Sequence, residues 1–77
     1  MEYIADRITI SSDLCNGKPT IRGKRITVQT ILEFLSAGDG KEDILAAYPS
    51  LEPEDIDACL KFASKLMENH YDIRPTA

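Results

Sequence analysis

The sequence has a single histidine, His70, and only two cysteines, Cys15 and Cys59, which lie far apart. One histidine excludes a metal site built on two histidines, and the cysteine spacing matches no metal-binding or redox motif. We expect two free thiols, and a disulfide between them stays open. No nucleophile stands beside a candidate base. The sequence therefore predicts a protein that is not an enzyme and holds no metal or cofactor.

Long apolar runs are also missing, which predicts that the chain does not span a membrane. The first six residues lack the basic and apolar regions of a secretory signal, so we expect a cytoplasmic protein. A chain of 77 residues has room for one domain with a small core. We predict a single domain over residues 1–77, with a short strand and a basic turn in 1–26, a helical bundle in 27–71 and a polar tail in 72–77.

Positive charge is scarce but concentrated in one place. The chain has a formal net charge of −4, yet residues 16–26, here called the basic turn, contain no acid. Four of the nine Lys and Arg residues lie in it, namely Lys18, Arg22, Lys24 and Arg25. Gly17 and Gly23 permit positive φ, and Pro19 restricts the backbone, which predicts a compact turn or hairpin. The segment is either a binding surface or a tight connector with solvated charges.

The N-terminal third shows a β pattern. Polar and apolar residues alternate in Arg7-Ile8-Thr9-Ile10-Ser11, which predicts one short strand within residues 4–10. Residues 20–22 and 24–27 flank Gly23 and are expected to pair as a tiny ribbon. Because neither piece is stable alone, both must lie on the helices.

Three later segments show helical periodicity. Thr27 is a suitable N-cap for a helix over 28–37, followed by Gly38. A second helix begins at 39 or 40 and ends before Pro49, and a third runs from Pro53 to 69 or 70. The predicted core positions share helical spacing: Ile31, Leu35, Ile44, Leu45, Ile56, Leu60, Ala63 and Met67, with Cys59, Phe62 and Leu66 beside them.

Several motifs together resemble one family. They are residues 17–26, Ala37-Gly38, Glu42-Asp43-Ile44-Leu45, Tyr48-Pro49-x-Leu51 and Glu54-Asp55-Ile56-x-Ala58-x-Leu60. Over about residues 5–66 the chain resembles the family called domain of unknown function 433. The resemblance implies a mainly α fold, a small three-helix, homeodomain-like helix-turn-helix bundle with a short N-terminal β strand or ribbon. The chain departs from the family at Glu52, where Thr or Ser is usual, so we expect a weaker N-cap there.

The resemblance also implies a function without catalysis. Members resemble the antitoxin half of a toxin–antitoxin pair, which implies a PIN-type, nuclease-like toxin protein as partner, and DNA bound by a dimer or other homo-oligomer. The alternative is a stand-alone helix-turn-helix regulator that binds DNA. The third helix is not expected to read DNA bases, because its first turns carry Glu54, Asp55 and Asp57, which repel phosphate. We interpret these acids as a solvated helix start that interacts with the helix dipole.

The candidate residues for binding nucleic acid or a protein partner are Lys18, Arg22, Gly23, Lys24 and Arg25. Arginine offers a planar fork that can bond a carboxylate twice, as in an acidic nuclease site. Gly23 either allows close approach of a partner or only makes the turn. Two alternatives stay open: Arg22 and Arg25 pair with the chain's own acids, such as Glu33 or Asp13, or the toxin binds an apolar helix face.

Overall fold

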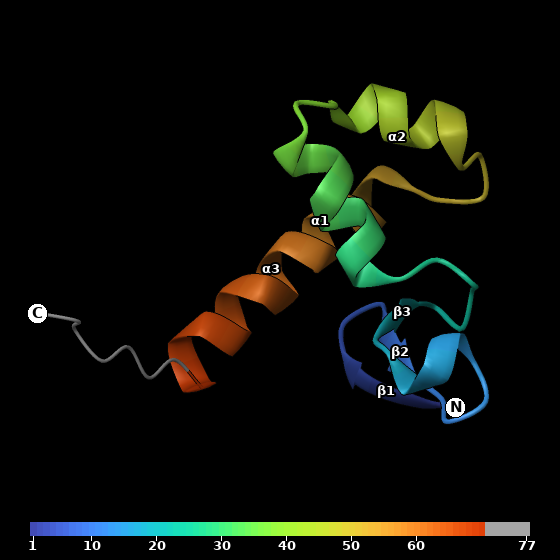
Figure 1. The fold of residues 1–77 in the computed structure, drawn as a ribbon, viewed down its shortest axis with the longest axis vertical. Helices are drawn as coiled ribbons and strands as arrows, with labels where there is room; N and C mark the ends of the chain where they lie inside the picture. The colour runs from blue at the N-terminus through green and yellow to red at the C-terminus, as the bar shows by residue number, and fades with distance from the viewer. Residues whose placement is uncertain (71–77) are drawn as a thin grey trace, which may run out of the picture.

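In the computed structural model the described residues are 1–70, without the side chains of 69 and 70. Three strands precede three helices (Figure 1). The elements, with one short 3₁₀ turn, are β1 (Glu2–Ala5), β2 (Ile8–Ile10), η1 (Cys15–Gly17), β3 (Thr20–Ile21), α1 (Val28–Ser36), α2 (Lys41–Ala47) and α3 (Pro53–His70). The predicted tail over 72–77 and the side chain of His70 lie outside the described residues.

The N-terminal segment folds back on itself. The prediction of one strand within residues 4–10 is wrong, because β1 and β2 form an antiparallel hairpin in which Tyr3 pairs with Thr9. Arg7 lies in the turn between them with φ of 64°, a left-handed conformation that is uncommon for residues other than glycine. Alternation of side chains in the sequence indicates a strand but does not show this reversal.

The third strand makes the sheet part of the core. β3 pairs antiparallel with β2, so that Ile8 lies opposite Ile21, and both side chains are fully buried. The ribbon predicted around Gly23 forms in its smallest version, a single bridge between Thr20 and Thr27. The predicted mainly α, homeodomain-like fold class is wrong. The chain is a small α+β fold, because a three-stranded sheet supplies core side chains instead of forming an appendage to a helical bundle.

The helix boundaries agree closely with the sequence pattern. Thr27 caps α1 by accepting a hydrogen bond from the Thr30 backbone N–H at 3.1 Å. The same helix ends at Ser36. Gly38, just beyond the C-cap, has φ of 98°, and the Asp39 N–H donates to the Phe34 carbonyl at 3.0 Å. This pattern is a Schellman motif, for which glycine is preferred. α3 begins at Pro53 as predicted.

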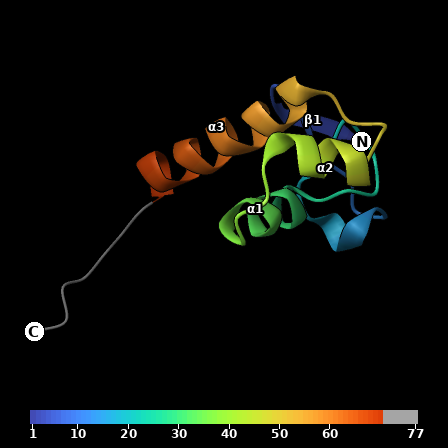
Figure 2. The ribbon, with the colours of Figure 1, turned by 90° about the horizontal axis from the view of Figure 1, so that it is seen from above.

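The side of α3 that packs against the core differs from the predicted side. Ile31, Ile44 and Ile56 are buried as expected, but Leu60 is 46% exposed and Met67 54% exposed. Cys59 is instead fully buried, and one residue along a helix turns the side chain by about 100°. The prediction that Leu60 and Met67 lie in the core is therefore wrong. The second half of α3 extends beyond the other elements in both views (Figures 1 and 2).

Candidate functional site

Buried threonines attach the basic turn to the sheet. Thr9 and Thr20 are fully buried, and their Oγ1 atoms lie 3.0 Å apart. The Gly23 backbone N–H donates to Thr9 Oγ1 at 2.8 Å. The Lys24 N–H donates to the Ile21 carbonyl, also at 2.8 Å. These bonds fix the path of the turn from β3 to α1.

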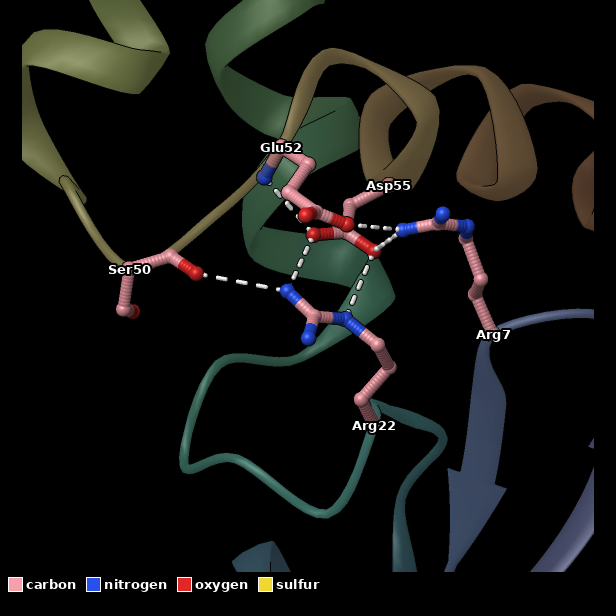
Figure 3. A network of polar contacts seen from close by, with 5 residues as sticks. All are labelled: Arg7, Arg22, Ser50, Glu52 and Asp55. Carbon is pink, nitrogen blue, oxygen red and sulfur yellow. Dashed lines mark hydrogen bonds and ion pairs between the residues drawn. The ribbon is translucent and has the colours of Figure 1, made fainter.

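Arg22 leaves this turn toward α3 and bonds Asp55 with two nitrogens (Figure 3). Arg22 Nε lies 2.9 Å from Asp55 Oδ1, and Nη2 lies 2.8 Å from Oδ2. Nη2 also approaches the Ser50 carbonyl at 3.3 Å. The Asp55 side chain is fully buried, whereas that of Arg22 is 29% exposed. The planar fork of an arginine is therefore used inside the fold.

A second arginine reaches the same carboxylate from the hairpin turn. Arg7 Nη1 lies 2.9 Å from Asp55 Oδ1 and 2.7 Å from Glu52 Oε1. The Glu52 backbone N–H donates to Asp55 Oδ2 at 2.8 Å. Asp55 thus also satisfies a backbone donor at the start of α3, as the acid of a capping box does. A Thr or Ser side chain at position 52 would accept from the Asp55 backbone N–H, which here bonds the Glu52 carbonyl at 2.9 Å.

The charges in this cluster stabilise one another. Burial would raise the pKa of Asp55, but the hydrogen bonds from Arg22, the Glu52 backbone and Arg7 outweigh it and lower that pKa to about 2. The pKa of Arg7 is raised, chiefly by its hydrogen bonds to Glu52 and Asp55. Both arginines have positive φ, 64° for Arg7 and 46° for Arg22. Two unusual backbone conformations therefore aim cations at one buried acid.

The role of Asp55 is not apparent from the sequence. Interpreting it as part of a solvated helix start is wrong, although Glu54 and Asp57 beside it are exposed as expected. Arg22 pairs within the chain, but with Asp55 and not with Glu33 or Asp13. A signal was present, since Asp55 occupies the third position of the helix, counting Pro53 as the first, where an acid can bond back to the cap residue.

The other candidate cations, unlike Arg22, do not pair with an acid in the described part of the fold. Lys18 and Arg25 are exposed and Lys24 is partly exposed, and none of them forms an ion pair with a described residue. Gly23 has φ of 70°, and a Cβ built on it would lie 2.5 Å from Met1 Sδ. Gly23 therefore lies against the chain's own N-terminus. The structure gathers three cations on the turn and directs the fourth, Arg22, inward.

Other chemistry is limited in the part of the chain that the structure describes. Among the side chains of residues 1–68, no three His, Cys, Asp or Glu are grouped so as to hold a metal ion. Cys15 and Cys59 are both free thiols, and burial raises the pKa of Cys59 to about 11. None of the described helices combines the length and apolar character needed to cross a bilayer.

Comparisons with known proteins agree with one another. The family described as "Protein of unknown function (DUF433)" matches residues 8–63. An uncharacterized protein of Sinorhizobium fredii, y4eO, is 39% identical over 49 residues, which are 64% of this chain and 22% of that protein. The crystal structure of a DUF433 member from Anabaena variabilis superposes with a TM-score of 0.75 at 32% identity, covering 80% of this chain and 61% of the other. This chain thus spans less than two thirds of either relative, and it belongs to the DUF433 family.

Proposed function

We propose that this chain is a non-catalytic interaction module of the antitoxin type, and that its basic turn binds an acidic site on a nuclease-like partner protein. The observation that supports this is the arrangement of cations on the turn. Lys18, Lys24 and Arg25 have no carboxylate partner among the described residues, although the chain as a whole is acidic. The pKa of Asp13 is lowered, chiefly by its hydrogen bond from Ser11 and in part by the nearby Arg25, but Arg25 forms no close ion pair with it. Cations that form no close ion pair on an acidic protein favour an anionic partner.

Arg25 is the arginine of the turn that is available to such a partner. Arg22 already uses Nε and Nη2 on Asp55, whereas Arg25 is exposed. A nuclease site that binds divalent metal is built from clustered carboxylates, so it is strongly anionic when empty. The Arg25 fork can bond one such carboxylate twice. Because the turn is anchored to the sheet through Thr9, little ordering entropy is lost on binding.

The experiment is co-expression of this chain with the product of the adjacent gene, followed by calorimetry with an inactive form of that product. Arg25→Gln removes one charge from the turn, and Lys41→Gln removes one from α2 as the matched control. We expect Arg25→Gln to weaken binding by at least about tenfold, because a charged interfacial hydrogen bond contributes roughly 1.5–3 kcal/mol. Equal affinities for both variants, or no complex with the wild-type chain, would contradict the proposal.

DNA is the second candidate partner, because the same three cations can contact phosphate. The start of α3 is an unsuitable base reader, since Glu54 and Asp57 are exposed there and repel phosphate. Contact by the turn predicts binding that weakens steeply with salt. Neutralising Lys24 and Arg25 together should reduce the slope of log K against log salt by roughly 2. An unchanged slope for a DNA fragment from upstream of the gene would exclude the turn as the contact.

A further inference from the structure

The second half of α3 has a hollow on each side. One, of about 480 Å³, lies between α3 and β1 and is lined by Ile4, Ala58, Phe62 and Leu66 among others. The other, of about 260 Å³, lies between α3 and the start of α1 and includes Val28 and Leu32. Phe62 and Leu66 line both hollows. We call the two hollows together the α3 groove.

The groove is apolar and open to solvent. Leu66 is 44% exposed and Ile4 41% exposed, and Phe62 is only partly buried. Phe62 and Leu66 are four residues apart, so they lie on one face of the helix. That face continues the buried stripe of Cys59 past the end of the core. Apolar side chains spaced by one turn, with a hollow on each side, have the shape that receives the apolar face of another helix.

Three lysines and one acid, Asp6, border this apolar surface. Lys61 and Lys65 line the first hollow, and Lys18 lines the second. None of the three forms an ion pair with a residue that the structure describes. Arg7, Arg22 and Lys41 contrast with them, since each is paired with an acid of α3. With Asp6 counted against the three lysines, the rim of the groove is still net positive, on a protein whose formal net charge is −4.

We propose that the α3 groove docks an amphipathic helix of a partner protein, with an apolar face flanked by Asp or Glu. The apolar side chains of that helix enter the two hollows, and its acids meet Lys18, Lys61 and Lys65. A second copy of this chain fits less well, because an antiparallel α3 pair brings Lys61 and Lys65 of one copy near those of the other. This docking site shares Lys18 with the basic turn but does not include Lys24 or Arg25, and it does not depend on the partner being a nuclease.

The test uses the full chain, labelled with nitrogen-15, and two synthetic helical peptides of about 18 residues, long enough to form a helix. Both carry leucine at i, i+4 and i+7, and one has glutamates along the flanks where the other has lysines. We expect the glutamate peptide to shift the amide resonances of residues 58–66 and of Ile4, and to bind at least about tenfold more tightly than the lysine peptide. Lys61→Glu with Lys65→Glu should reverse this preference. Lys41→Glu, on α2, should leave it unchanged.

Several results would overturn the proposal. They are equal binding of the two peptides, shifts confined to other surfaces, and no shift from either peptide at millimolar concentration. A dimer of the wild-type chain that Leu66→Glu dissociates would assign the groove to a second copy. If deleting residues 71–77 shifts the groove resonances while the full chain binds neither peptide, the groove belongs to the chain's own C-terminal segment. Failure here leaves the role of Arg25 untouched, because Arg25 lines neither hollow and its test varies Arg25 alone.

Discussion

Arg22 and Asp55 lie 33 residues apart in the chain and form a two-bond contact, with Arg22 Nε 2.9 Å from Oδ1 and Nη2 2.8 Å from Oδ2. The contact joins the basic turn to the first turn of α3. Arg7, in the hairpin turn between β1 and β2, binds the same carboxylate. One buried acid thereby ties three segments together, and it positions the turn that we propose as the partner-binding surface.

Removing the Asp55 charge should destabilise the fold. Asp55→Asn leaves Arg7 and Arg22 without their shared carboxylate, and we expect a loss of about 3 kcal/mol in the free energy of unfolding. This is the lower end for breaking a buried ion pair, because the arginine side chains keep some solvent contact. Asp57→Asn is the matched control on the same helix. It removes an exposed ion pair with Lys41, which contributes less than about 1 kcal/mol to the free energy of unfolding. Urea denaturation of both variants measures the difference, and equal losses would contradict the assigned role of Asp55.

Stability should also depend on pH through Asp55. The pKa of this group falls from 3.8 to about 2 on folding, so the unfolded chain binds the proton more readily. The stabilisation is complete above the unfolded value and is lost as pH falls through the folded value. A shift of this size corresponds to about 2 kcal/mol. We expect the free energy of unfolding to decline between about pH 5 and pH 2. The decline should be smaller in Asp55→Asn, and an identical pH profile would show that other carboxylates cause it.

Two substitutions on α3 test the corrected core. Ile56 is fully buried, and Ile56→Ala should lower the free energy of unfolding by about 3 kcal/mol through lost burial and an unfilled cavity. Leu60 is 46% exposed, and Leu60→Ala should cost less than about 1 kcal/mol. Thermal denaturation of the two variants distinguishes the observed side of α3 from the one expected from the sequence. A larger loss of unfolding free energy for Leu60→Ala than for Ile56→Ala would show that Leu60 lies in the core, as the sequence predicted.

The two thiols should react at different rates. Cys59 is fully buried and its pKa is raised to about 11, so little reactive thiolate forms near neutral pH. Cys15 is partly exposed. In a Cys15→Ser variant we expect the remaining thiol to react with a disulfide reagent only as fast as the chain opens, and denaturant should release that reaction. Rapid modification of native Cys15→Ser would show that the Cys59 environment is open.

Local patterns in the sequence predicted much of the helical part. Thr27, Gly38 and Pro53 mark helix ends because caps and prolines act through neighbouring backbone atoms. The sheet was harder to predict, because the reversal at Arg7 requires a positive φ that arginine rarely adopts. The alternation of residues 7–11 does not specify a partner strand. The fold class was wrong for this reason.

The cluster at Asp55 could not be predicted from local pattern. An acid in the first turn of a helix has the same sequence signature whether it is solvated or buried. What buries Asp55 is the arrival of Arg7 and Arg22 from 48 and 33 residues away. The basic turn was located correctly from its charges, but the sequence did not distinguish Arg22, which points inward, from Arg25, which is exposed. That distinction depends on tertiary contacts.

The different roles that we propose for these two arginines are tested most directly by calorimetry with an inactive form of the proposed nuclease-like partner. Arg→Lys at each position keeps the charge and removes the fork. We predict that Arg25→Lys weakens binding by about tenfold or more with unchanged stability. Arg22→Lys should lose about 1–2 kcal/mol of unfolding free energy yet bind within about twofold of the wild type at a temperature where it is folded. If folded Arg22→Lys loses affinity as Arg25→Lys does, or if Arg25→Lys binds as the wild type does, the proposed division is wrong.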